Sequence, residues 1–317
     1  MAERVVKVAT GAPGKVFFEK KIIEAPGRVC LYAKADYAET LKFFDEFDRA
    51  VLVEHRYVEL DFSGTEHITA AAALVLFAKV TRCQCCLIPG TFSFPSDVIT
   101  VKLPENKAMK DLFVNTGLWA ALRPGGVKKL DKLWGDWANP FKTGNDASSE
   151  LPDIIKHLMQ QFDPMPLKIV SALQESYLNI AHHAYELFKL NGDVMHPFME
   201  GRWWQYARRN DQTKKINIVI YDMGNGIPAS IGDGHQMIRD CDSIKYAMMS
   251  GVTRLKIQGR GMGFNNIKRP IEVNAGAEYL VVYSARGQVI YRQGDVVTEL
   301  NHGRHVGGTL IEWVFGA

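Results

Sequence analysis

Residues 175–185 read ESYLNIAHHAY, and the spacing of their polar side chains decides the fold expected for the second half of the chain. Glu175, Asn179 and His183 stand four residues apart, so an α-helix places them along one side with a drift of about 40° per step. A carboxylate there can deprotonate an attacking water or hydroxyl, and an amide oxygen suits Mg²⁺. The alternative, for a helix considered alone, is an ordinary solvated face.

Two glycine-rich stretches follow, DMGNGI starting at Asp222 and GRGMGFNNIK starting at Gly259. Asp222 ends the strand-like run INIVIYD, and the glycines after it let the backbone approach a flat ligand closely. Gly259, Gly261 and Gly263 precede a predicted helix, whose N-terminus and N–H groups can hold phosphate. Each stretch alone is compatible with a plain turn or loop, but both in this order arise by chance in on the order of one chain in a hundred.

The three stretches resemble the sequence boxes of the GHKL ATP-binding fold, which gyrase, MutL and histidine kinases share. ESYLNIAHHAY corresponds to the ExxxN box, DMGNGI to DxGxGI and GRGMGFNNIK to GxGxGxxxxK, while GGTLIEW resembles the last strand of that fold. The resemblance covers about residues 167–316 and is closest to the anti-sigma-factor serine kinases. It implies a two-layer α/β sandwich with a mixed sheet.

The same resemblance implies a role for each residue of the site. Glu175 would be the general base, Asn179 would hold Mg²⁺, and Asp222 would accept a hydrogen bond from the adenine amino group. The glycines of the second box would form the floor of the base pocket and those of the third would wrap the phosphates, beneath a mobile lid over residues 228–258. The residues expected to bind ATP besides Asp222 are His183, Gly224, Gly226, Gly259, Gly261, Gly263 and Lys268.

Residues 58–123 alternate strand-like and helical patterns, which predicts an α/β layer. YVELDF and DVITVKL are expected to be strands, and ITAAAALVLFAKV and NKAMKDLFVNTGLWAAL are expected to be helices. A further helix is expected over residues 38–53 and an earlier strand over residues 28–34.

The stretch VELDFSGTEHITAAAAL resembles part of a STAS domain, the fold of anti-sigma-factor antagonists, over roughly residues 28–123. In those antagonists a partner kinase phosphorylates a serine at the helix start. Ala70 aligns with that serine, so phosphorylation at this position is excluded. The nearby hydroxyls of Thr69 and Ser63 are expected to cap the helix or lie in the loop.

Residues 124–152 are rich in turn-forming residues, which places a domain boundary near residues 143–150. We therefore expect a STAS-like α/β domain over 1–142, a linker over 143–166 and a GHKL ATP-binding domain over 167–317. In the last of these, a helix is expected over 167–190. RWWQYARR and KKINIVIYD are expected to form a hairpin, and EYLVVYS, QVIYRQ and GGTLIEWVF to be the closing strands.

Composition limits the classes of function. The chain has 317 residues, 47% of them hydrophobic, and a net charge of +3, so no global positive field indicates a nucleic-acid binder. RWWQYARR interleaves aromatic and basic groups as single-strand-binding surfaces do, but inward packing of a hairpin strand is the favoured interpretation. No apolar run reaches the length of a membrane span, and the five cysteines are expected to be free thiols in a reducing cytoplasm rather than a zinc site.

The sequence therefore predicts a cytoplasmic regulator of bacterial or phage type that binds ATP and Mg²⁺. Glu175 is present, so ATP hydrolysis or transfer of phosphate to a serine or threonine of a partner is possible. The alternatives are a non-enzymatic switch, in which ATP changes which partner is held, and a nucleic-acid-linked ATPase. We expect a protein partner for the STAS-like domain and consider a homodimer possible, with neither nucleic acid nor membrane as a partner.

Overall fold

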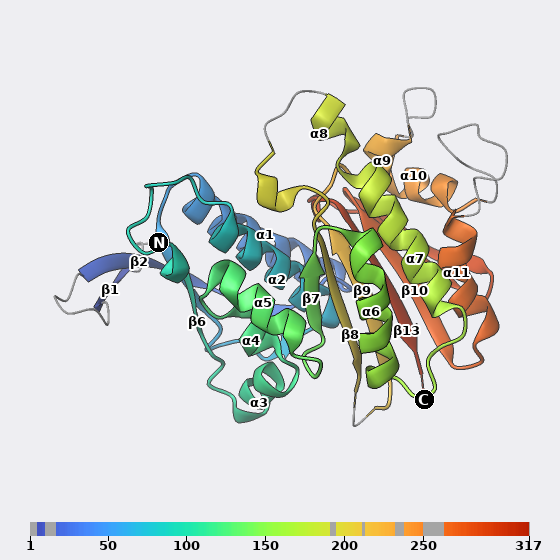
Figure 1. Ribbon diagram of the computed structural model, residues 1–317, viewed down its shortest axis with the longest axis horizontal. Coiled ribbons are helices and arrows are strands. Elements are labelled where there is room, and N and C mark those ends of the chain that lie inside the picture. Colours follow the sequence, from blue (N-terminus) through green and yellow to red (C-terminus); the bar gives the residue numbers. More distant parts are fainter. Residues whose placement is uncertain are drawn as a thin grey trace. The chain divides into compact units, whose positions relative to one another are not determined.

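The computed structural model describes residues 5–9, 17–190, 195–210, 213–231, 238–249 and 263–316. The chain divides into two compact units, Met1–Phe141 and Lys142–Ala317. Both units combine helices with β-sheet (Figure 1), which confirms the mixed α/β class. None of the helices within the described ranges is long and apolar enough to cross a membrane.

A mixed sheet forms the centre of the first unit. β1 pairs antiparallel with β2, whereas β2, β4 and β6 run parallel. The predicted strands YVELDF and DVITVKL are β4 and β6, but the strand expected over residues 28–34 is only the short β3, which pairs with β5 outside the main sheet. The strands, with those of the main sheet in spatial order, are β1 (Val5–Ala9), β2 (Phe17–Glu24), β4 (Tyr57–Asp61) and β6 (Ile99–Lys102), then β3 (Arg28–Val29) and β5 (His67–Ile68).

The helices of the first unit follow the predicted pattern except at two places: one expected helix is divided, and α5 lies in the stretch 124–152, where only turns were expected. The single helix expected for NKAMKDLFVNTGLWAAL is two helices, because Gly117 adopts a left-handed conformation (φ 74°) between them. Thr69 caps α2 as expected, since its hydroxyl accepts a hydrogen bond from the N–H of Ala72 (3.4 Å). The helices are α1 (Lys34–Leu52), α2 (Ala70–Cys85), α3 (Lys107–Asn115), α4 (Leu118–Leu122) and α5 (Gly126–Gly135), with a 3₁₀ turn at Pro95–Asp97.

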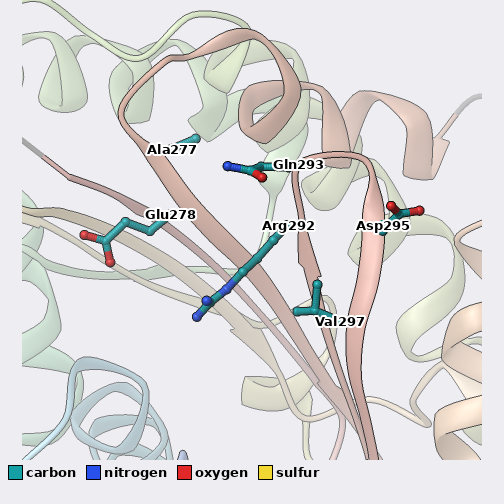
Figure 2. A pocket seen from close by; sticks show the side chains of 6 residues that line it. All are labelled: Ala277, Glu278, Arg292, Gln293, Asp295 and Val297. Carbon is teal, nitrogen blue, oxygen red and sulfur yellow. The ribbon is translucent and has the colours of Figure 1, made fainter.

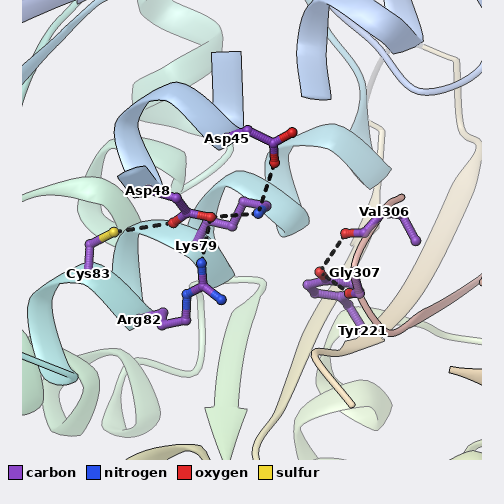
Figure 3. Close-up of polar contacts among 8 residues, drawn as sticks. All are labelled: Asp45, Asp48, Lys79, Arg82, Cys83, Tyr221, Val306 and Gly307. Carbon is purple, nitrogen blue, oxygen red and sulfur yellow. Dashed lines mark hydrogen bonds and ion pairs between the residues drawn. The ribbon is translucent and has the colours of Figure 1, made fainter. Parts of the chain in front are cut away.

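An ionic cluster joins α1 to α2 in the buried part of this unit (Figure 3). The carboxylate of Asp48 lies 2.6 Å from both the Lys79 ammonium and the Arg82 guanidinium. The thiol of Cys83 donates to the same carboxylate (3.3 Å), and burial raises the pKa of that thiol. Cys83 is therefore a structural thiol of the helix interface and not a reactive one.

A seven-stranded sheet forms the second unit, and every pairing from β12 to β8 is antiparallel. The expected hairpin is β8 with β9, and the expected closing strands are β10, β11 and β13. The mixed character expected for this sheet is absent from those pairings. In spatial order the strands are β12 (Asp295–Asn301), β11 (Gly287–Arg292), β10 (Ala277–Ser284), β13 (Thr309–Phe315), β9 (Ile216–Asp222), β8 (Trp203–Arg209) and β7 (Phe141–Gly144).

Helices α6, α7 and α11 cover one face of this sheet (Figure 1). The indole N–H of Trp313 in β13 donates to the carbonyl of Ile267 in α11 (2.8 Å), and the rings of Tyr177 and Trp203 meet edge to face at 5.0 Å. The helices are α6 (Ala147–Gln161), α7 (Ile169–Asn179), α8 (Glu186–Leu190), α9 (Ile227–Ser230), α10 (Asp240–Ala247) and α11 (Gly263–Val273), with a 3₁₀ turn at Pro197–Met199.

The stretch 143–166, expected to be a linker, differs from that expectation. It contains α6 and the end of β7, an edge strand of the sheet. Asp146 caps α6 by accepting from the N–H of Ser149 (3.3 Å), and Ile154 and Leu158, one turn apart, are buried. The turn-rich composition before α6 thus coincides with the boundary between the two units at Phe141 and Lys142, and the residues that follow this boundary form a folded helix instead of a linker.

The aromatic and basic strand β8 lies inside the sheet, between β9 and β7. Trp203 and Trp204 are completely buried, and Tyr206 is 8% exposed. Bases cannot stack on rings that solvent does not reach, so inward packing is the correct interpretation of RWWQYARR and the single-strand-binding interpretation is wrong.

Candidate functional site

The stretch ESYLNIAHHAY forms the end of α7 and a π-helical turn, Ile180–Ala184. The continuous helix expected over residues 167–190 is therefore interrupted. The π-helical turn is a rare element that occurs often at functional sites. The carbonyl of Ala184, its last residue, accepts a hydrogen bond from the N–H of Asn225 (2.7 Å), so the first motif directly holds the second.

The DMGNGI loop is held by hydrogen bonds to most of its backbone N–H groups. The N–H of Met223 donates to the Tyr185 hydroxyl (3.2 Å), that of Gly224 to the Asp222 carboxylate (2.8 Å), and that of Ile227 to the Ser284 hydroxyl (2.8 Å). A Cβ on Gly224 would lie 2.1 Å from the carbonyl oxygen of Ala184, so this position requires glycine. The loop is thereby fixed before any ligand arrives.

We expect Tyr185→Phe to lower the free energy of unfolding by about 1–3 kcal/mol, because the hydroxyl is buried and joins two segments. It accepts from Met223 and donates to the carbonyl of Arg202, both of which would lose that partner. Urea denaturation measures the change. Tyr291→Phe is the comparison, since the Tyr291 hydroxyl in β11 donates to the exposed Glu272 carboxylate in α11 (2.7 Å) and does not hold the DMGNGI loop. An unchanged stability in Tyr185→Phe would contradict the anchoring role.

Asp222 lies at the end of β9 and is only 5% exposed. It faces Thr309 of β13, and Gly308 (φ 88°) packs so tightly that a Cβ there would lie 2.0 Å from the Asp222 carbonyl oxygen. Burial raises the pKa of the Asp222 carboxyl to about 7, although backbone N–H groups of Gly224 and Thr309 oppose this shift. The carboxyl is therefore a buried acceptor without a cation beside it in the described part of the chain.

A tyrosine of β9 holds the turn that precedes β13. The Tyr221 hydroxyl lies 3.0 Å from the carbonyl oxygen of Val306 and also contacts that of Gly307 (Figure 3). This holds the turn that brings Gly308 against Asp222. Gly226, at φ 79°, completes the same corner, since a Cβ there would lie 2.9 Å from the Ser284 hydroxyl oxygen.

Glu175 lies against the N-terminus of α11, at the last glycine of the third motif. A Cβ on Gly263 would lie 2.6 Å from Oε1 of Glu175, and the side-chain amide of Asn266 lies 3.5 Å from Oε2. The first motif thus contacts both the second, through Ala184, and the third, through Glu175. Gly259 and Gly261 lie outside the described residues.

The remaining predicted site residues differ in their surroundings. Asn179 is the last residue of α7, and no described residue hydrogen-bonds its half-buried side chain. His183 lies in the π-helical turn, with Nδ1 3.8 Å from a carboxylate oxygen of Glu186, so the α-helical spacing assumed for it does not hold. The Lys268 ammonium donates to the carbonyl of Met248 (2.9 Å) and lies over the Tyr291 ring, so it is engaged within the protein.

The segment expected to be a loop-rich lid, residues 228–258, contains helix α10. Cys241 and Ile244 of α10 are buried, and Lys245 pairs with Glu299 of β12 (2.9 Å). This part of the segment is therefore attached to the sheet. Residues 232–237 and 250–258 lie outside the described residues.

Three positions of the site were not predicted from the sequence: Tyr185, Ser284 and Gly308. Tyr185 belongs to the first motif, but the sequence did not indicate that its hydroxyl forms hydrogen bonds with two backbone groups. Gly308 had a visible signal, because the pair Gly307–Gly308 precedes a strand and both residues have positive φ. Ser284 ends a strand, and nothing in its sequence context indicates a contact with the loop at Ile227.

A surface hollow lies at the other end of the sheet (Figure 2). Ala277 at that end pairs with Phe315, whereas Ser284, Thr309 and Asp222 pair across the opposite end of the same strands. The hollow is therefore not part of the motif cluster. Its lining residues are Ala277, Glu278, Arg292, Gln293, Asp295 and Val297.

No protein-family model and no curated protein matches the chain. The resemblance to the GHKL fold therefore depends on the three motifs and on the positions of their residues. Within the described part of the chain, no three His, Cys, Asp or Glu side chains gather in a way that could hold a metal ion.

Proposed function

We propose that the second unit, Lys142–Ala317, binds ATP with Mg²⁺ as a GHKL-type domain and turns the nucleotide over. The observation that carries the proposal is the convergence of three motifs that lie far apart in the sequence. Ala184 contacts the loop after Asp222, while Glu175 contacts the N-terminus of α11. Three motifs that arose by chance would not be expected to contact one another around α7 and the turn that follows it.

The surroundings of these residues fit the groups that ATP presents. Asp222 offers a buried carboxyl acceptor, which suits the amino group of a flat base beside a glycine-lined loop. The α11 N-terminus at Gly263 offers the positive end of a helix dipole, which favours phosphate. Asn179 would hold Mg²⁺, which supplies charge neutralisation at the phosphates when bound.

Glu175 is the group that would act on the nucleophile. Its carboxylate would accept a proton from a water or a hydroxyl while the oxygen of that group bonds to the γ-phosphorus of ATP and the bond to the leaving ADP breaks. The carboxyl would then give this proton up to the products or to solvent. The first unit resembles a STAS domain, so a partner protein is a natural source of the hydroxyl, with water as the other acceptor. Ala70 has no hydroxyl, so the chain does not present that acceptor itself.

We expect Asn179→Ala to weaken ATP binding at least tenfold in the presence of Mg²⁺ and to change binding little in EDTA, because the metal loses its protein ligand. Calorimetry with and without Mg²⁺ measures both affinities. Gln174→Ala is the matched control, since Gln174 is an exposed amide on the same helix. Equal Mg²⁺-dependent affinity in wild type and Asn179→Ala would refute the assignment of the metal ligand.

Labelled ATP with Mg²⁺, incubated with and without cell lysate, tests the proposed activity. Free phosphate indicates hydrolysis, and a labelled protein band that needs both lysate and this chain indicates a protein acceptor. ATP binding without either product supports the non-enzymatic switch. Absence of ATP binding overturns the whole proposal.

A further inference from the structure

The carboxylate of Glu175 is contacted at both oxygens by a single helix. Oε1 lies beside Gly263, and Oε2 lies 3.5 Å from the Asn266 side-chain amide. Gly263 and Asn266 are three residues apart in α11, so the helix presents them on the same side. A shift of α11 relative to α7 would therefore alter both contacts together.

The two contacts differ in what they do to the carboxylate. Gly263 provides space, because any side chain there would displace Oε1. Asn266 provides a direction, because an amide N–H donor favours one rotation of the carboxylate plane over others. With Oε2 facing Asn266, Oε1 stays at the N-terminus of α11, and the backbone N–H groups of that terminus are the expected phosphate site.

We propose that Asn266 is a positioning residue for Glu175: its amide holds one carboxylate oxygen so that the other faces the nucleophile at the α11 N-terminus. The inference rests on the proposed function, since it assigns Asn266 a part in the same reaction. Asn266 need not touch the nucleotide. Its donor can be replaced only by a side chain of similar length that also donates.

Kinetics of Asn266 variants test this role. We expect Asn266→Ala to lower kcat about tenfold and to change the KM for ATP less than threefold, which is the scale for loss of a partner that orients a functional group. Asn266→Asp should be at least as slow, because it has the same shape but repels the carboxylate. In a Glu175→Gln background, Asn266→Ala should cause no further loss.

Arg269→Ala is the control, because Arg269 lies one turn further along α11, is exposed and pairs only with Glu272 among the described residues. It should keep wild-type kcat. If wild type turns over ATP and Asn266→Ala matches it, the inference fails while the proposed function stands. Full additivity of Asn266→Ala with Glu175→Gln would also overturn it, since the losses would then be independent.

A readout without turnover separates the two proposals. The side-chain amide resonances of Asn266 in the nucleotide-free protein should move on Glu175→Ala and stay in place on Gln174→Ala. Unmoved resonances in Glu175→Ala overturn the contact itself, whatever the enzyme does. If the wild type binds ATP without turning it over, the catalytic part of the proposed function and the positioning role are both overturned. If the Asn266 resonances nevertheless move in Glu175→Ala, the contact between the two side chains is still established.

Discussion

Replacement of Glu175 by Gln is expected to lower ATP turnover by roughly 10² or more while nucleotide affinity stays within severalfold. Gln keeps the size of the side chain and an oxygen near Gly263, but it cannot accept a proton from the nucleophile. The loss should therefore appear in kcat and not in the KM for ATP. Phosphate release under saturating ATP and Mg²⁺ gives the rate, and calorimetry gives the affinity.

Gln174→Ala serves as the matched variant, because it changes the neighbouring residue on the exposed side of α7. It should keep the wild-type rate. An equal rate in wild type and Glu175→Gln would exclude Glu175 as the base. If that common rate is zero while ATP still binds, the non-enzymatic switch becomes the better description of the protein.

The strands and helices with strong apolar patterns were predictable from the sequence. INIVIYD and GGTLIEWVF carry enough β-branched and aromatic residues to be recognised as β9 and β13, and the apolar run of α2 is a helix buried on all sides, with Leu74 to Phe77 completely inaccessible. Local pattern was sufficient there because each of these elements is buried along most of its length.

Elements with weak or mixed patterns were missed. β12, DVVTELN, is an edge strand with most residues exposed, so it lacks the apolar alternation of its neighbours. The first turn of α6 carries Ser148, Ser149 and Glu150, which resemble a loop unless the cap at Asp146 is recognised. The capping pattern was available in the sequence, whereas β12 depends on pairing with β11 that only the fold supplies.

The candidate site was predictable in its residue types and less so in its geometry. The motif spacing placed Glu175 and Asn179 on one helix, which is how α7 has them. The π-helical turn at Ile180–Ala184 could not be predicted, because it depends on a distant residue: the carbonyl of Ala184 accepts a hydrogen bond from the N–H of Asn225. Lys268 shows the same limit, since its position in the motif does not reveal that Met248 accepts from its ammonium.

Asp222→Asn is expected to stabilise the nucleotide-free protein at pH 8 by up to about 4 kcal/mol and to stabilise it much less near pH 4. Burial raises the pKa of this carboxyl from 3.8 to about 7, a difference of about 3 units at 1.36 kcal/mol each. The unfolded chain releases the proton near pH 4, while the folded protein keeps it until about pH 7. Between these values the folded state binds more protons, so stability falls as pH rises, and above pH 7 the full cost of the buried charge is present.

Asparagine removes this cost because it carries no charge and its side-chain oxygen can still accept from the N–H of Gly224. Urea denaturation of both proteins at pH 4.5 and pH 8 measures the difference. Asp295→Asn, which changes an exposed carboxyl of β12, is the control that should show no such pH dependence.

Asp222→Asn should also weaken binding of ATP and lower the preference for ATP over GTP, since Asn presents both a donor and an acceptor where a base amino group needs an acceptor. Stabilisation that is equal at the two pH values would mean that the carboxyl is not the buried, uncompensated charge that the site at the end of β9 implies, and an unchanged ATP preference would remove Asp222 from base recognition.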